Sequence, residues 1–352
     1  MKIEELLGLM VEKEASDLHL RVMRPPTLRI DGRLKVVEGM PNVTPSDLEE
    51  AFEHVTNENQ RQRFRNELEL DLAYSIKGLS RFRINAFLQR DTISLAIRRV
   101  PFGVPTIDEL GLPEICKSLA LKTRGLVLVT GRTGTGKSTT LAAMIDHLNK
   151  SEARNIITIE DPIEYVFRDE KCMIAQRDLG SDTKSFANAL RHVIRQDPDV
   201  ILVGEMRDLE TIATAITAAE TGHLVLSTLH TPSAGEAIDR MIDVFPPYQQ
   251  EQIRLQLSLV LEGVLSQVLL RRASGRGRVA AVEVMLGTAA VRNIIREGKI
   301  AQMPTYIQTG SQFDMQTMDQ ALQNLVRSRV VMVEEALPFF TKPDELLRRQ
   351  PV

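Results

Sequence analysis

The sequence predicts an α/β fold in which a smaller α+β domain precedes a doubly wound parallel sheet. The first observation is a phosphate-binding loop pattern, Gly131 to Ser138, between a buried strand and an amphipathic helix. The second is the alternation of strand and helix patterns around and beyond this loop, which is typical of parallel sheets. The third is the length of 352 residues, which is enough for two domains with separate cores.

The first hundred residues give the pattern of the smaller domain. An amphipathic helix opens the chain at Ile3, and Asp31-Gly32 separates two short alternating segments, which indicates a hairpin. Thr44 and Pro45 are a capping residue and a first-turn proline, so a helix is expected to begin there. Three further strands are expected at residues 70–76, 81–88 and 92–98.

The second domain follows a segment rich in proline and glycine, residues 101–113, which is typical of a linker. We therefore expect domains at residues 1–100 and 114–352. Strand patterns in the second domain lie at residues 126–129, 155–159, 200–203 and 224–228, with amphipathic helices between them. The apolar residues of 253–270 follow one helical face and are interrupted by polar ones, so this segment predicts a helix that does not span a membrane.

The phosphate-binding loop carries its own chemistry. Its glycines let successive backbone N–H groups point at one phosphate chain. Lys137 supplies a positive charge for the β and γ phosphates, and the Ser138 hydroxyl is a ligand for Mg²⁺. The sequence therefore predicts a nucleoside triphosphate site. The expected binding residues are Gly131, Arg132, Thr133, Gly134, Thr135, Gly136, Lys137, Ser138 and Thr139.

Composition excludes several other classes of protein. The net charge of −3 gives no global basic field for nucleic acid, although local basic patches such as Arg271 to Arg278 remain. That run is typical of a mobile hairpin tip. It contains no aromatic residues that could stack on bases. Two cysteines, Cys116 and Cys172, are too few for a disulfide framework or a tetracysteine zinc site, and we expect both to be buried.

Two strands of the first domain carry a set of arginines on one face. Alternation places Phe82, Ile84, Ala86 and Leu88 inward and groups Arg81, Arg83 and Asn85 on the opposite face. On the next strand Arg98 also points outward. The pattern alone leaves two interpretations open: a solvated basic face, or arginines that are offered to a nucleotide held by the second domain.

Carboxylates follow two of the predicted parallel strands, where ligands of such sheets bind. One group is the acidic segment 160–164, which includes Glu164, and the other is Glu205, which follows Gly204. A carboxylate at a strand end supports Mg²⁺, usually through water. His223 and His230 bracket the strand at 224–228; the ligand set for a metal is incomplete, so we expect hydrogen-bonded roles for them.

These motifs resemble secretion ATPases of type II and type IV pilus systems, and among them the pilus retraction ATPases. The resemblance rests on residues 131–138, 158–164, 197–208, 221–223 and 228–231. Residues 16–19, 25–26, 29–32, 81–85 and 315–320 extend it over nearly the whole chain. It implies a homohexameric ring whose protomers carry a PAS-like N-terminal domain and a RecA-like P-loop motor domain.

The resemblance also implies roles for residues of the site. Lys137 and Ser138 hold the phosphates of ATP and Mg²⁺, Glu205 supports Mg²⁺, and Glu164 activates the attacking water. His223 and His230 act as sensors near the nucleotide. Arg81, Arg83 and Arg98 reach the nucleotide when the two domains close, which favours the second interpretation of the arginine face.

The implied function is ATP hydrolysis that powers pilus retraction and twitching motility. Such an ATPase is cytoplasmic, lies at the inner face of the cytoplasmic membrane, contacts a membrane-embedded platform protein and binds no nucleic acid. The segment Val291 to Lys299 resembles a retraction-family segment, with Val291, Ile294 and Ile295 expected inward and Arg292, Arg296 and Lys299 expected outward for a partner. Neither a tetracysteine motif nor extra N-terminal domains stand in this sequence, which favours retraction over a pilus extension or type II secretion ATPase. A RecA-like DNA motor is the alternative of another class.

Overall fold

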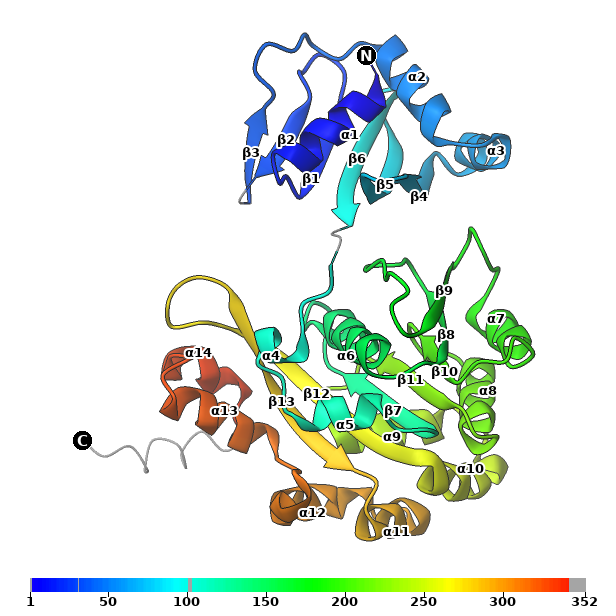
Figure 1. Ribbon diagram of the computed structural model, residues 1–352, viewed down its shortest axis with the longest axis vertical. Coiled ribbons are helices and arrows are strands. Elements are labelled where there is room, and N and C mark those ends of the chain that lie inside the picture. The colour runs from blue at the N-terminus through cyan, green and yellow to red at the C-terminus, as the bar shows by residue number, and fades with distance from the viewer. Residues whose placement is uncertain (1, 31, 101–102, 342–352) are drawn as a thin grey trace. The chain divides into compact units, whose positions relative to one another are not determined.

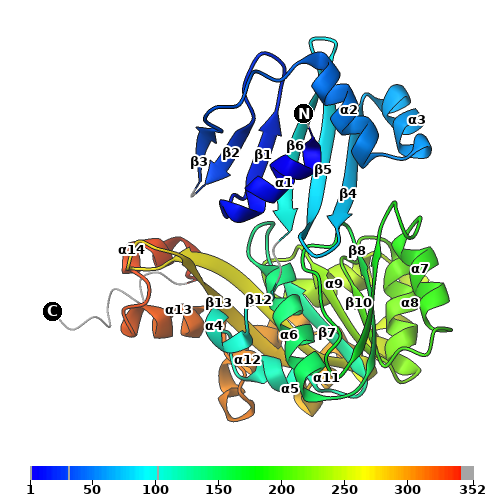
Figure 2. The same ribbon diagram turned by 45° about the horizontal axis from the view of Figure 1, so that its top comes forward.

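The computed structural model describes residues 2–30, 32–100 and 103–341 (Figures 1 and 2). Contacts divide the chain into two compact units. The first consists of residues 1–103, with which residues 164–166 are grouped, and the second consists of residues 104–163 and 167–352. Each unit is described by itself below.

The first unit is a six-stranded antiparallel sheet with the order β3-β2-β1-β6-β5-β4. The sheet and its helices share an apolar core that includes Leu7, Leu18, Phe52, Phe82 and Ile97. The elements are α1 (Ile3–Glu12), β1 (Asp17–Leu20), β2 (Thr27–Ile30), β3 (Arg33–Val36), α2 (Pro45–Val55), α3 (Glu58–Glu67), β4 (Glu69–Ile76), β5 (Ser80–Gln89) and β6 (Thr92–Val100).

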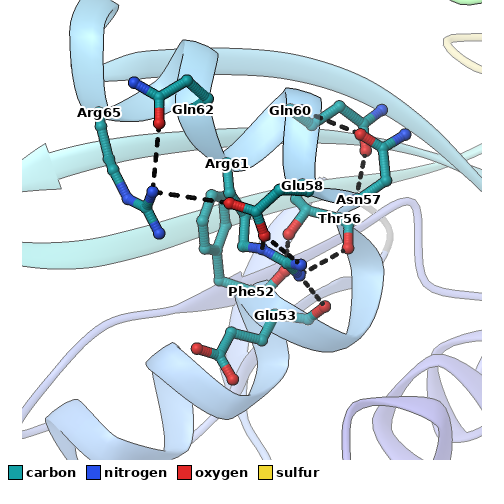
Figure 3. A network of polar contacts seen from close by, with 9 residues as sticks. All are labelled: Phe52, Glu53, Thr56, Asn57, Glu58, Gln60, Arg61, Gln62 and Arg65. Carbon is teal, nitrogen blue, oxygen red and sulfur yellow. Dashed lines mark hydrogen bonds and ion pairs between the residues drawn. The ribbon is translucent and has the colours of Figure 1, made fainter.

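The corner between α2 and α3 is held by side chains that satisfy helix ends (Figure 3). Only two residues separate the helices, and Asn57 forms a capping box with Gln60 at the start of α3. Arg61 donates to the carbonyls of Glu53 and Thr56, at 3.2 and 3.0 Å, so it satisfies acceptors that the end of α2 leaves unpaired. The corner therefore needs no glycine.

Most predictions for this unit are confirmed. The opening helix, the helix that begins after Thr44 and the three later strands are present, and β2 pairs with β3 as a hairpin. Asp31, in the predicted turn, lies outside the described residues. The inward position predicted for Leu88 is wrong, because this residue lies next to the β5–β6 turn and is 39% exposed.

The second unit is built on a seven-stranded sheet with the order β13-β12-β7-β11-β10-β8-β9. All neighbours are parallel except β12 and β13. The strands are β7 (Gly125–Thr130), β8 (Asn155–Glu160), β9 (Met173–Asp178), β10 (Val200–Val203), β11 (Leu224–Leu229), β12 (Leu261–Arg271) and β13 (Arg278–Leu286). The helices between and beyond them are α4 (Ile107–Leu110), α5 (Ile115–Ala120), α6 (Lys137–Ser151), α7 (Phe186–Val193), α8 (Leu209–Glu220), α9 (Ala234–Asp243), α10 (Pro247–Val260), α11 (Ala289–Glu297), α12 (Met303–Thr309), α13 (Met318–Arg327) and α14 (Val333–Ala336).

Helices cover both faces of this sheet, as predicted for a doubly wound fold (Figure 2). Alternate residues of β7 enter different cores, since Leu128 belongs to the cluster with α7 to α12 and Val129 to the cluster with α4, α5 and α6. Both residues are fully buried, as is every residue of β7. The unbroken apolar run that predicted this strand is therefore explained by cover on both faces. The two cysteines are buried, as expected.

The prediction of one helix over residues 253–270 is wrong. The helix α10 ends at Val260, and β12 begins at Leu261 and pairs in parallel with β7. Residues 261–270 of β12 are all buried or partly buried, and an apolar run of this kind fits helical and strand spacing equally, so its apolar positions could not distinguish the two. Within the described ranges, no helix is both long enough and apolar enough to cross a membrane.

The segment predicted as a linker contributes to the second unit. Thr106 forms a capping box with Glu109 at the start of α4, and Ile107 and Leu112 are buried in the core beside α5 and α6. Residues 101 and 102 lie outside the described residues. The domain limits at 1–100, 101–113 and 114–352 stay a prediction.

Candidate nucleotide-binding site

The phosphate-binding loop joins the end of β7 to the start of α6, as the motif predicted. Gly131, Gly134 and Gly136 have φ values of +141°, +82° and +89°, a region that side chains with a Cβ rarely adopt. A Cβ on Gly131 would lie 2.5 Å from the Gln267 carbonyl oxygen. The loop can therefore follow this path only with glycine at its first position.

Lys137 is 8% exposed and its ammonium lies within the loop. Its Nζ donates to the carbonyl oxygens of Gly131 and Arg132, at 2.8 and 3.2 Å, and lies 3.4 Å from His230 Nδ1. Ser138 follows on the exposed side of the first turn of α6. A positive side chain and the N-terminus of a 15-residue helix meet here, an arrangement that attracts phosphate.

Glu205, beyond the end of β10, is the carboxylate that the fold brings to this loop. Its Oε1 accepts from Arg207 Nε at 2.7 Å and lies 3.0 Å from His230 Nε2. Burial alone would raise the pKa of Glu205, but the hydrogen bonds and charges of Arg207 and His230 outweigh burial and hold this pKa below its ordinary value. Glu205 is therefore ionised at neutral pH.

One pocket of about 500 Å³ lies between the loop and Glu205. Its lining residues are Arg132, Thr133, Glu205, Arg207 and His230. Two parts of the predicted site, the loop and the Glu205–His230 pair, are thus next to each other. The oxygen donors available, a hydroxyl on Ser138 and a carboxylate on Glu205, are of the kind that Mg²⁺ prefers. The described residues contain no cluster of three or more His, Cys, Asp or Glu side chains that could hold a metal without substrate or water.

The acidic segment 160–164 begins at the end of β8, next to Gly204. Glu160 ends β8, and its Oε1 accepts from the Thr158 hydroxyl at 2.6 Å and from Gln176 Nε2 at 3.1 Å. A Cβ on Gly204 would lie 3.3 Å from the Glu160 Cα, so glycine lets the two strand ends approach. Glu164 is exposed, four residues beyond the strand, and its role as the base stays a prediction.

His223 and His230 lie at opposite ends of β11, and the roles predicted for them as sensors near the nucleotide stay predictions. β11 separates them: Leu224 pairs with Gly125 at one edge of the sheet and Leu229 with Thr130 at the other. A strand of six residues spans about 20 Å. The Nδ1 of His223 lies 2.9 Å from the Ala218 carbonyl oxygen, at the end of α8, whereas His230 reaches the loop.

The arginines of the first unit share a face, as predicted. Arg83 and Arg98 are direct cross-strand neighbours, and Arg81 lies two residues along β5 from Arg83. Arg98 is 72% exposed, and its Nε donates to Asp17 Oδ1 at 2.9 Å. Whether these side chains act on a nucleotide stays a prediction.

Sequence reasoning missed Asp17, which is buried and also lies 3.5 Å from Arg29 Nε. Burial opposes ionisation of Asp17, but the Ser16 hydroxyl and Arg98 lower its pKa overall. Asp17 therefore anchors Arg98 as an ionised partner. The alternation of the strand that begins at Asp17 could have predicted on which face of the sheet Asp17 lies. It could not have predicted that Arg98, 81 residues away, is its partner.

Gln267 is a second residue that sequence reasoning missed, because its segment was interpreted as a helix. Its side chain is 1% exposed and connects the phosphate-binding loop to the first turn of α6. The Nε2 donates to the Thr135 carbonyl at 2.7 Å, and the Oε1 accepts from the Thr140 hydroxyl at 3.0 Å. β12 therefore holds the loop in place through one buried amide.

The surface predicted for residues 291–299 is partly confirmed. Val291, Ile294 and Ile295 are buried, and Arg296 and Lys299 are exposed. The outward position of Arg292 is wrong: its guanidinium donates to Glu262 Oε1 at 2.8 Å and to the Ser258 carbonyl at 3.0 Å. Its long stem lets the charge turn back onto the junction of α10 and β12.

The chain is similar to known proteins over nearly its whole length. The family model described as "Type II/IV secretion system protein" matches residues 3–338. The type IV pilus retraction ATPase PilT of Pseudomonas aeruginosa is 48% identical over 336 residues, which are 96% of this chain and 97% of that protein. A twitching motility protein of Neisseria gonorrhoeae is 47% identical over 88% of this chain and 83% of its own length.

A solved structure of the pilus retraction motor PilT with bound ADP has a TM-score of 0.91 to this chain. It is 46% identical in sequence, and the match covers 99% of each chain. The predicted fold class, an N-terminal α+β domain with a RecA-like P-loop domain, is confirmed by this match. The chain belongs to the type II/IV secretion system protein family.

Proposed function

We propose that this protein is an ATPase that powers type IV pilus retraction. The observation that carries the proposal is that His230, which lines one pocket with Glu205, contacts both Glu205 and Lys137 of the phosphate-binding loop. The high identity to a pilus retraction ATPase over nearly the full length of both chains favours retraction of the pilus over its extension.

The chemistry follows from the positions of the groups. Lys137 and the N-terminus of α6 would hold the β and γ phosphates, while Ser138 and Glu205 would hold Mg²⁺, which supplies charge neutralisation for the transferred phosphoryl group. Glu164 would activate the attacking water. These roles fit the oxygen donors present and the ionised state of Glu205.

His230 is suited to report on the phosphates. One imidazole contacts both groups, because His230 Nε2 lies 3.0 Å from Glu205 Oε1 and His230 Nδ1 lies 3.4 Å from Lys137 Nζ. When phosphate draws Lys137 away, this contact is lost while the contact to Glu205 can remain. His230 would thereby couple phosphate binding to the metal-supporting carboxylate.

We further propose that six copies form a ring and that each arginine face acts on a nucleotide. Arg81, Arg83 and Arg98 would supply positive charge to the transition state, an effect worth about 10³ to 10⁵ in rate in other phosphoryl-transfer systems. Domain movement during the ATP cycle would turn a platform protein at the inner face of the cytoplasmic membrane. Support for this step comes from the family and from the shared face of the arginines.

A deletion of the gene tests the direction of the motor. Loss of a retraction ATPase leaves excess fibres that do not retract and abolishes surface motility, and the gene for the Lys137→Ala variant should fail to restore motility. Cells without fibres would instead identify an extension or secretion ATPase and would contradict the proposal.

A further inference from the structure

The hairpin between β12 and β13 projects from the end of the sheet beside α14 (Figures 1 and 2). Its tip is ordered by backbone bonds rather than loose: Arg271 pairs with Arg278, and the Arg272 N–H donates to the Gly277 carbonyl at 3.2 Å. Gly275 and Gly277, with φ values of +73° and +75°, allow this tight turn. The mobility predicted for this tip stays a prediction.

The base of the hairpin is anchored on its own apolar cluster. Leu270 and Val279 pack with Leu322 and Val331 of the α13–α14 region, and all four are buried. The Ala273 N–H donates to the Val330 carbonyl at 2.8 Å, which brings the end of α13 against the tip. The hairpin and the end of α13 thus form one surface.

Six arginines lie on this surface and are exposed or partly exposed: Arg271, Arg272, Arg276, Arg278, Arg327 and Arg329. In the part of the chain that the structure describes, none of them forms an ion pair with a carboxylate. Glu335, which reaches the tip, accepts from the backbone N–H of Arg271 at 3.4 Å rather than from a guanidinium. The charge of this tip is therefore not neutralised by these neighbours, although the whole chain carries −3.

An exposed apolar side chain accompanies the charge. Met332, two residues from the Val330 contact, is 57% exposed. A convex tip that combines several arginines with an apolar side chain matches a surface of anionic headgroups over acyl chains. Nucleic acid fits less well, because no aromatic residue lies at residues 268–282 or 325–336 to stack on bases.

We propose that the arginine tip, formed by these six arginines and Met332, binds the anionic phospholipid surface of a membrane. Each guanidinium contributes charge attraction at the headgroups, so affinity should rise with anionic lipid content and fall with salt. In an assembly of several copies, several tips would bind one surface together, which strengthens attachment without new contacts.

The experiment measures sedimentation of the full chain with phosphatidylcholine vesicles, with and without phosphatidylglycerol. The test variant replaces Arg276, Arg278 and Arg329 by Gln, because no side-chain contact of these residues supports the hairpin, whereas Arg272 Nε bonds the Arg278 carbonyl. The matched control replaces Arg33, Arg63 and Arg65 of the first unit by Gln, which changes the net charge equally.

We expect the wild-type chain and the control to bind vesicles that contain phosphatidylglycerol and to ignore pure phosphatidylcholine. The test variant should bind roughly a hundredfold more weakly, since each arginine near such a surface contributes about fivefold. ATP turnover without vesicles and the melting temperature should be unchanged in the variant, which separates this proposal from the proposed function.

Three results would overturn the inference. The wild-type chain could fail to bind anionic vesicles, or the variant could bind as well as the control. Alternatively, duplex DNA or polyglutamate could be retained through these arginines while vesicles are not, which would assign the tip to a nucleic acid or an acidic protein.

Discussion

At the scale of single residues, the site depends on groups that hold the phosphate-binding loop rather than only on those that contact phosphate. Gln267 is the clearest example, since its buried amide joins the Thr135 carbonyl to the Thr140 hydroxyl. Replacing it with Leu leaves both groups buried without their partner. An unsatisfied buried polar group costs about 1–3 kcal/mol.

We therefore predict that Gln267→Leu weakens ATP binding by ten- to hundredfold and lowers kcat less. Titration with a fluorescent ATP analogue, together with kcat and KM, measures the two effects separately. In a double-mutant cycle, Thr140→Val should add little to Gln267→Leu, because the two side chains share one hydrogen bond. Additive losses, or a fall in kcat with unchanged affinity, would show that Gln267 does not position the loop.

At the scale of elements, helix termini carry signals that sequence reasoning could use. Thr44 accepts from the Asp47 N–H at 3.2 Å, and Asp47 accepts from the Thr44 N–H at 2.9 Å. The hydrogen bonds from the Thr44 hydroxyl and backbone lower the pKa of Asp47 to about 2. The pKa of Asp47 in the folded chain lies below the ordinary value of 3.8. The ionised carboxylate therefore makes its full contribution to the free energy of unfolding above pH 4, and this contribution is lost as the pH falls towards 2.

We accordingly predict that Asp47→Ala lowers the free energy of unfolding by about 1 kcal/mol at pH 6, which is the usual contribution of a helix N-cap. The difference from the wild-type chain should shrink as the pH falls from 4 towards 2. Urea unfolding at several pH values checks this, with Glu49→Ala on an exposed position of α2 as the control. A difference that does not change with pH would contradict the assignment of the cap to the ionised carboxylate.

What could be predicted from the sequence depended on how local the signal was. The phosphate-binding loop needs only consecutive residues, and Gly204-Glu205 needs only the end of one strand, so both were found. The partners of Arg98 and Arg292, which are Asp17 and Glu262, lie far away in sequence, and no periodicity reports them. The strand predicted between His223 and His230 is present as β11 and places them at its opposite ends, although they are close in sequence.

At the scale of the whole molecule, the two units have distinct tasks. In the proposed function the second would hold the nucleotide in its pocket, and the first presents Arg81, Arg83 and Arg98 on one sheet face. On this face an ionised Asp17 pairs with Arg98. The proposed ring uses this division, because a motor needs one element that binds ATP and another that responds to it.

Steady-state ATP hydrolysis by the Glu205→Gln variant tests the central claim, that this pocket hydrolyses ATP, most directly. The change keeps the shape but removes the charge that would support Mg²⁺, so the account predicts a fall in kcat of at least a hundredfold with the melting temperature nearly unchanged. The matched control is Glu297→Gln, an exposed carboxylate paired with Lys299, which should hydrolyse ATP like the wild-type chain. Turnover by Glu205→Gln equal to that of the control would contradict the account.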